Sequence, residues 1–113
     1  MMNIQIFGNK KCFDTKKAER YFKERGIKFQ KIDLIQKGIS PGELKSITQS
    51  ICIENLINKE SPYYKESGLA YTQDRDTMNK IILDYTKVLK TPIVRNGKKA
   101  SVGYQPDIWK TWE

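Results

Sequence analysis

The chain has 113 residues, of which 38% are hydrophobic and 30% are charged, and its formal net charge is +8. This length and composition fit one globular domain with a modest core, so we expect a single domain over residues 1–113. No stretch approaches the roughly 20 apolar residues of a membrane span. The N-terminus enters a strand-like run directly, so we expect neither a membrane partner nor a signal peptide.

The positive charge permits anionic partners but does not choose among them. The 21 basic residues are dispersed along the chain. They form no basic run interleaved with aromatic residues, the pattern that single-stranded nucleic-acid binders use. A solvated lysine-rich surface is therefore favoured over a nucleic-acid site.

The chain contains two cysteines, Cys12 and Cys52, and no histidine. Two cysteines are too few for a disulfide framework or a typical zinc site, so we expect a reducing, cytoplasmic location, no metal and no bound cofactor. The absence of histidine excludes Ser-His and Cys-His catalysis. Activation of any nucleophile must then come from dipoles and lysines.

The first predicted elements form a βαβ unit. The apolar run 4–7 predicts a strand, and Gly8 and Asn9 form a loop. The spacing that follows predicts a helix over 14–25, ended by Gly26, and a second strand over 28–33. A strand, helix and strand of these lengths indicate two parallel strands with a right-handed crossover.

Cys12 lies at the junction between the first strand and the first helix. There the unpaired backbone N–H groups and the helix dipole favour an anion, so we expect a lowered thiol pKa. Lys10, Lys11, Lys16 and Lys17 lie within five residues and should act in the same direction. The alternative is an inert, buried cysteine flanked by solvated lysines, but the strand–loop–helix context favours a reactive thiol.

The middle of the chain is mainly helical. Ser40 and Glu43 form a capping box around Pro41, which predicts a helix start. Residues 53–73 suggest a short helix and turns, and a stronger helix follows after a cap at Asp74. Cys52 stands between two isoleucines, so we expect it in the core rather than as a resolving cysteine.

The end of the chain predicts a ββα unit. Pro92 breaks the helical segment, and its peptide bond is open to either isomer. Short strands over 93–95 and 100–102 are joined around Asn96-Gly97, a dipeptide that favours a type I′ turn. A last helix carries Trp109 and Trp112, which we expect to anchor the core.

This order of elements resembles the thioredoxin fold, and the helical insertion narrows the resemblance to the ArsC/Spx family. That family comprises glutaredoxin-linked arsenate reductases, Spx-type transcription regulators and YffB-like proteins, and the chain is nearest in character to the YffB-like or Spx-like branch. The resemblance covers nearly the whole chain. It is carried by Cys12 with residues 16–18, by residues 56–59 and 64–69, by Thr91-Pro92-Ile93-Val94, and by Val102-Gly103-Tyr104.

The resemblance implies an α/β, thioredoxin-like fold with a four-stranded mixed sheet, βαβ then ββα. Residues 1–36 and 90–113 would form its core, and residues 40–89 a helical insertion between strands two and three. It also implies a monomeric thiol oxidoreductase with Cys12 as nucleophile and an external thiol, such as glutathione or a glutaredoxin-like protein, as co-substrate. The supporting residues would be Lys11, Thr15, Lys16 and Lys59, which stabilise the thiolate or bind an anion, and Thr91 and Pro92, which form a substrate loop.

Two alternative functions stay open. The arsenate reductases of this family bind the oxyanion with three arginines, and the matching positions here are Asn58, Thr91 and Gly103-Tyr104. Lysine does not reproduce the bidentate guanidinium geometry, so arsenate reduction should be weak. The other alternative is an Spx-like regulator that binds an RNA polymerase subunit or another protein. Spx proteins usually carry CxxC, and Thr15 stands at the second cysteine position, which excludes that internal disulfide.

Overall fold

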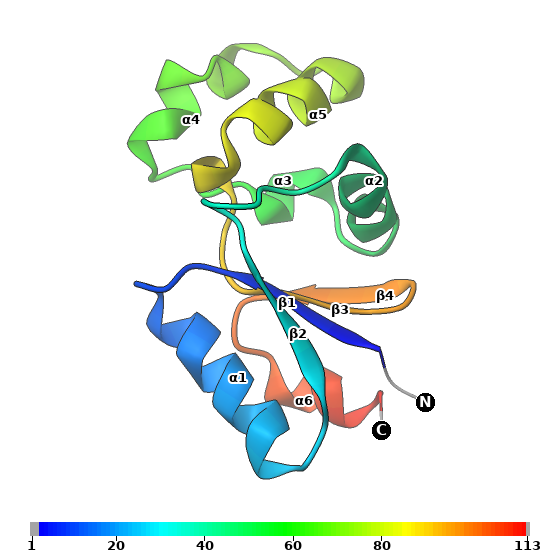
Figure 1. Cartoon of the computed structure of the whole chain (residues 1–113). Helices are drawn as coiled ribbons and strands as arrows, with labels where there is room; N and C mark the ends of the chain where they lie inside the picture. The colour runs from blue at the N-terminus through cyan, green and yellow to red at the C-terminus, as the bar shows by residue number, and fades with distance from the viewer. Residues whose placement is uncertain (1–2, 113) are drawn as a thin grey trace.

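One mixed four-stranded sheet organises the chain in a computed structural model that describes residues 3–112 (Figure 1). The spatial order of the strands is β2-β1-β3-β4. β1 pairs with β2 in parallel and with β3 antiparallel, and β3 pairs with β4 antiparallel, which confirms the predicted mixed sheet. The strands are β1 (Ile4–Gly8), β2 (Phe29–Asp33), β3 (Ile93–Asn96) and β4 (Lys99–Val102).

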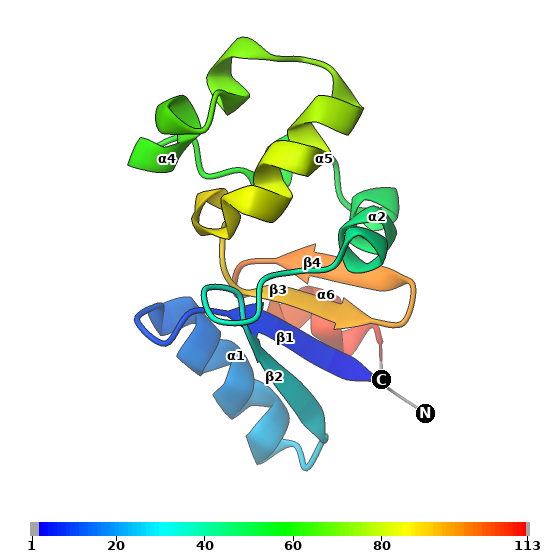
Figure 2. The ribbon, with the colours of Figure 1, turned by 45° about the horizontal axis from the view of Figure 1, so that its top comes forward.

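Helices cover both faces of this sheet (Figures 1 and 2). On one face lie α1 (Phe13–Glu24), which links β1 to β2, and α6 (Pro106–Lys110), which follows β4. The segment between β2 and β3 covers the other face. It contains α2 (Pro41–Ser50), α3 (Ile53–Leu56), α4 (Pro62–Glu66), η1 (Leu69–Tyr71), α5 (Arg75–Asp84) and η2 (Thr86–Val88).

The capping signals in the sequence are confirmed. The Ser40 side chain accepts a hydrogen bond from the Glu43 N–H while the Glu43 carboxylate accepts one from the Ser40 N–H. The Asp74 carboxylate caps α5 by accepting from the Thr77 N–H. None of the helices in residues 3–112 has the length and apolar character needed to cross a bilayer.

The β3–β4 turn differs from the expectation. Asn96 pairs with Lys99, so the two turn residues are Gly97 and Lys98. Gly97 has φ 59°, whereas no non-glycine residue among those described has positive φ. A left-handed glycine in the first turn position alone is the pattern of a type II′ turn. The prediction of type I′ was wrong because the strand continues through Asn96.

Two hydrophobic cores lie on opposite faces of the sheet. The smaller one joins alternate β1 residues to α1 and α6, and contains Ile4, Ile6, Ala18, Tyr21, Phe22, Val94 and Trp109. The larger one joins Phe7 and Ile93 to the helices between β2 and β3. This division follows from the two-residue repeat of a strand, which sends neighbouring side chains to opposite faces.

Trp109 is fully buried, as predicted, and Trp112 packs partly buried against the same core. The Trp109 indole N–H donates to the Ser101 hydroxyl at 2.7 Å. Because both groups are buried, this bond joins α6 to β4 without leaving a polar group unsatisfied.

Replacing Ser101 with alanine should lower the free energy of unfolding by about 1–3 kcal/mol, because the indole N–H is then buried without an acceptor. Urea unfolding followed by tryptophan fluorescence and circular dichroism measures this loss. The double variant Ser101→Ala/Trp109→Phe is the matched control, and it should lose less than the sum of the two single variants. Strict additivity would contradict the proposed coupling.

Candidate functional site

The loop after β1 positions Cys12 as the N-cap of α1. Cys12 has extended backbone angles, φ −88° and ψ 120°, and its N–H donates to the Asn9 carbonyl at 3.0 Å. The Asn9 side chain accepts from the Lys11 N–H at 3.0 Å, which tightens the same turn. The sequence prediction of a cysteine at the N-terminus of the first helix is confirmed.

Gly8 allows the first turn of α1 to pack closely on the end of β1. A Cβ atom at residue 8 would lie 2.3 Å from Thr15 Cγ2 and 2.8 Å from Thr15 Oγ1. Thr15 is only 5% exposed, so it has little room to move away. The Thr15 hydroxyl also accepts from the Asn9 N–H at 3.4 Å. The absence of a side chain at residue 8 therefore allows Thr15 to pack against the end of β1.

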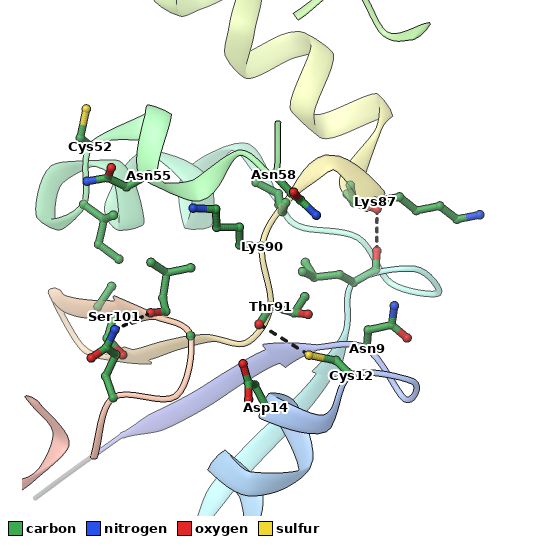
Figure 3. A pocket seen from close by; sticks show the side chains of 18 of the residues that line it. Asn9, Cys12, Asp14, Cys52, Asn55, Asn58, Lys87, Lys90, Thr91 and Ser101 are labelled. Carbon is green, nitrogen blue, oxygen red and sulfur yellow. Dashed lines mark hydrogen bonds between the residues drawn. The ribbon is translucent and has the colours of Figure 1, made fainter. Parts of the chain in front are cut away.

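The segment that leads into β3, the strand paired with β1, faces Cys12. The antiparallel register pairs Phe7 near the end of β1 with Ile93 at the start of β3, and the Thr91–Pro92 peptide bond is cis. The Cys12 thiol donates to the Thr91 carbonyl at 3.6 Å (Figure 3). On the other side, the Pro92 carbonyl accepts from the Gly103 N–H at 2.8 Å, which holds the segment to the chain after β4.

The surroundings of Cys12 favour its thiolate. Partial burial raises the pKa of the Cys12 thiol, but hydrogen bonds oppose this effect and lower the pKa overall. They come from the Thr15 and Thr91 side chains and from the Thr15 and Asp14 backbone. Donors aimed at the sulfur stabilise the anion more than the neutral thiol. The expected lowering of the pKa is therefore present, and its physical cause is hydrogen bonding rather than the charges of nearby lysines.

Two of the lysines named from the sequence, Lys16 and Lys59, line cavities other than the one that Cys12 lines. Lys16 places its ammonium 5.9 Å from the centre of the Phe13 ring and lines a separate cavity of about 400 Å³. Lys59 lines a third cavity of about 470 Å³ with residues of the helical segment. Lys11 is exposed in the turn before Cys12. The structure thus brings Cys12, Thr15 and the Thr91–Pro92 segment together and leaves Lys16 and Lys59 in other cavities.

Cys12 opens into a cleft of about 1090 Å³ between the sheet and the helical segment. Asn58, Thr91 and Gly103, three positions singled out by the resemblance, all line it. Sequence reasoning missed Asn55, Lys87 and Lys90, because these residues are distant from Cys12 in the chain and carry no motif. Figure 3 shows these three side chains together with Cys12 and Thr91.

Asn58 and Lys90 are held by a short antiparallel bridge. Ile57 pairs with Leu89. On either side of that pair, the Asn58 N–H donates to the Val88 carbonyl at 2.8 Å and the Lys90 N–H donates to the Leu56 carbonyl at 2.7 Å. The wall of the cleft opposite Cys12 is therefore built from hydrogen-bonded backbone, which limits its freedom to move.

Cys52 also lines this cleft, but it is exposed, and the prediction that it lies in the core was wrong. Cys52 is the N-cap of α3, with φ −56° and ψ 133°. The side chain of Ile53, the first residue of α3, is buried and that of Ile51 is half-buried, whereas the Cys52 side chain between them is exposed. Within residues 3–112, no cluster of three His, Cys, Asp or Glu side chains is placed to hold a metal ion.

The sheet order, the half-buried cysteine at the start of α1 and the cis-proline segment facing it define a thioredoxin-like protein with one cysteine at the usual position of the nucleophile. The sequence pattern of the ArsC family matches residues 7–112, and the chain belongs to this family. The fold and the family inferred from the sequence are thus confirmed.

Similar proteins include members of all three groups of the family. The chain is 27% identical to global transcriptional regulator Spx 2 of Oceanobacillus iheyensis, over 94% of this chain and 80% of the relative. It is 30% identical to an arsenate reductase of Neisseria meningitidis, over 91% of this chain and 92% of the relative. Among solved structures, a YffB protein superposes with a TM-score of 0.84 at 19% identity, covering 96% of this chain and 97% of that one.

Replacing Thr15 with valine should raise the pKa of the Cys12 thiol, because valine keeps the buried volume but cannot donate to the sulfur. The inflection in the rate of iodoacetamide alkylation against pH should move upward by about one unit. The experiment uses the Cys52→Ser background, so that only Cys12 is alkylated. Thr15→Ser, which keeps the hydroxyl, should stay near the parent value; an unchanged inflection in the valine variant would refute the role of Thr15.

Proposed function

We propose that the protein is a thiol oxidoreductase that uses Cys12 as its only nucleophile and an external thiol to complete each cycle. The observation that supports this most directly is the hydrogen-bonded setting of the sulfur. Thr15 and Thr91 stabilise the thiolate, and the sulfur remains half-buried at the wall of an open cleft. Thiolate rather than thiol is the attacking species, so a lowered pKa and access to a substrate are the two requirements.

The chemistry needs two exchange steps. The Cys12 thiolate attacks one sulfur of a disulfide substrate, a new bond forms between the two sulfurs, and the substrate S–S bond breaks to release the other half as a thiolate. An external thiol, such as glutathione or a glutaredoxin-type protein, then attacks the mixed disulfide. That second attack breaks the bond to Cys12, restores its thiolate and leaves the substrate half bonded to the external thiol.

An external thiol is proposed because the other cysteine is not directed at the first. Cys52 sits at the far end of the cleft in Figure 3, with its sulfur pointing away from Cys12. Thr15 occupies the position at which a CxxC pair would have its second thiol. The arrangement therefore favours a monothiol cycle over an internal disulfide.

Purified protein supplied with glutathione, glutathione reductase and a glutathione mixed disulfide should show turnover, measured as NADPH consumption above the uncatalysed rate. Cys12→Ser should abolish this turnover, since a hydroxyl at this site does not attack a disulfide. Cys52→Ser should retain it, because no step uses that sulfur. Turnover that survives loss of Cys12, or no turnover in the wild type, would overturn the proposal; the second result is what an Spx-like binding protein would give.

Arsenate reduction is a second candidate, supported by the convergence of Asn58, Thr91 and Gly103 on the cleft of Cys12. The relative named arsenate reductase is 30% identical to the chain. However, no arginine of residues 3–112 lines the cleft, and Arg95 is bonded to Gln5, Ser46 and the Gly97 carbonyl. The chain thus keeps the nucleophile and lacks the guanidinium groups that bind an oxyanion bidentately.

Wild-type protein should therefore reduce arsenate weakly or not at all, even with glutathione and glutaredoxin present. Each missing charge-assisted hydrogen bond should cost about 1.5–3 kcal/mol, though not additively. The double variant Asn58→Arg/Thr91→Arg should raise Cys12-dependent arsenate reduction, measured as arsenite formed. Asn58→Lys/Thr91→Lys is the control that adds the same charge without the planar fork. Robust wild-type activity would show that the lysines suffice.

A further inference from the structure

We propose that Lys90 forms a carboxylate subsite in the cleft and makes Cys12 selective for disulfides whose transferred half carries a negative charge. This inference rests on the proposed function, since it concerns which disulfides reach the Cys12 sulfur. It names the class of disulfide that would react with Cys12, and it gives a role to Lys90, which belongs to no sequence motif.

The size of the cleft indicates a substrate larger than an oxyanion. Its volume of about 1090 Å³ lies just above the roughly 300–1,000 Å³ typical of small-molecule sites. Its walls carry four amide side chains, Asn9, Asn55, Asn58 and Gln105, and mixed apolar surface. Amides both donate and accept hydrogen bonds, which matches peptide-like groups better than a fully charged tetrahedral anion.

The charged groups of the cleft are separated along its length. Asp14 is the one carboxylate among the described residues that line it, and it follows Cys12 by two positions. In Figure 3 the Lys90 side chain extends away from Cys12 toward Asn55, whereas Lys87 points in the opposite direction. A substrate carboxylate would be repelled beside Asp14 and attracted beside Lys90. The charged groups are thus arranged along the cleft: Asp14 lies near the reacting sulfur of Cys12, and the Lys90 ammonium lies farther from that sulfur.

Lys90 is available for this role. Within residues 3–112, no carboxylate lies within ion-pair distance of its ammonium. Its backbone is fixed by the hydrogen bond to Leu56, so the start of the side chain is well positioned. Lys87, by contrast, holds its ammonium 5.4 Å from the centre of the Tyr63 ring. Lys87 is therefore a matched control with the same charge, in the same segment, but differently directed.

The test uses single-turnover exchange in the Cys52→Ser background. The probes are 2-thiopyridyl mixed disulfides of 3-mercaptopropionate and of 3-mercaptopropionamide, which differ only in the carboxylate. Cys12 attacks the mercaptopropionyl sulfur, the probe S–S bond breaks, and pyridine-2-thione leaves and is followed by its absorbance. The same leaving group serves both probes, so the ratio of their rates reports recognition of the charge. A second pair, thiopyridyl disulfides of Cys-Glu and Cys-Gln dipeptides, extends the test to peptide thiols.

At pH 7 and low salt, Lys90→Gln should lower the rate with the carboxylate probe about fivefold and leave the amide probe unchanged. Lys90→Arg should keep the preference, Lys87→Gln should change it little, and added salt should weaken it. Equal losses in Lys87→Gln and Lys90→Gln would show that only overall charge matters and would overturn the proposal, as would no loss in either. The activated probes need only an accessible Cys12 thiolate, so the charge preference is measurable even if the turnover experiment fails.

Discussion

The antiparallel pairing of β1 and β3 is the constraint on which the site depends. It sets Phe7 opposite Ile93, so the loop that leaves β1 and the segment that enters β3 meet at the same edge of the sheet. Cys12 lies on the first of these and Thr91 on the second, which is why a thiol and a carbonyl separated by 79 positions lie 3.6 Å apart. A slip of one residue in this register would turn the alternating core residues to the wrong faces, so core packing and the geometry of the site are maintained together.

The two faces of the sheet differ: one carries a core that stabilises the fold, and the other carries the cleft of Cys12. The face covered by α1 and α6 carries an aromatic core around Phe22 and Trp109. The other face is covered by the helices between β2 and β3, whose core contacts start from Phe7 and Ile93. The Leu56–Asn58 and Val88–Lys90 bridge then forms the wall opposite Cys12. Differences within this inserted segment would change the wall of the cleft without altering the placement of the sulfur.

Local patterns predicted the parts of the structure that depend on near neighbours. The sequence predicted the strand, loop and helix around Cys12, the capping box at Ser40 and the cap at Asp74, because each involves residues only a few positions apart. The resemblance to the family supplied the four-stranded mixed sheet and the helical insertion, which periodicity alone does not determine. The turn at Gly97 was misassigned because one extra residue of β3 shifts the turn by one position.

The errors in the site have a common physical origin. Lys16 follows Cys12 closely in sequence but lines another cavity, and Cys52 has apolar neighbours but faces outward. Side-chain direction depends on the local backbone, which charge and composition do not reveal. Lys90 and Asn55 were missed for the converse reason, since tertiary packing alone brings them to the cleft.

The chemistry of the site follows from what stabilises the sulfur and what lines the space beyond it. A thiolate held by hydroxyl and backbone donors keeps its nucleophilic character without a neighbouring cation. The cationic group therefore does not have to lie beside the sulfur and can be placed where a substrate carries its own charge. Among the described residues, this cleft is lined by amide side chains and by two lysines, Lys87 and Lys90, which point in different directions, and by no arginine. Under the proposed function, such a distribution separates activation of the nucleophile from recognition of the substrate, and it suits an extended disulfide better than a compact oxyanion.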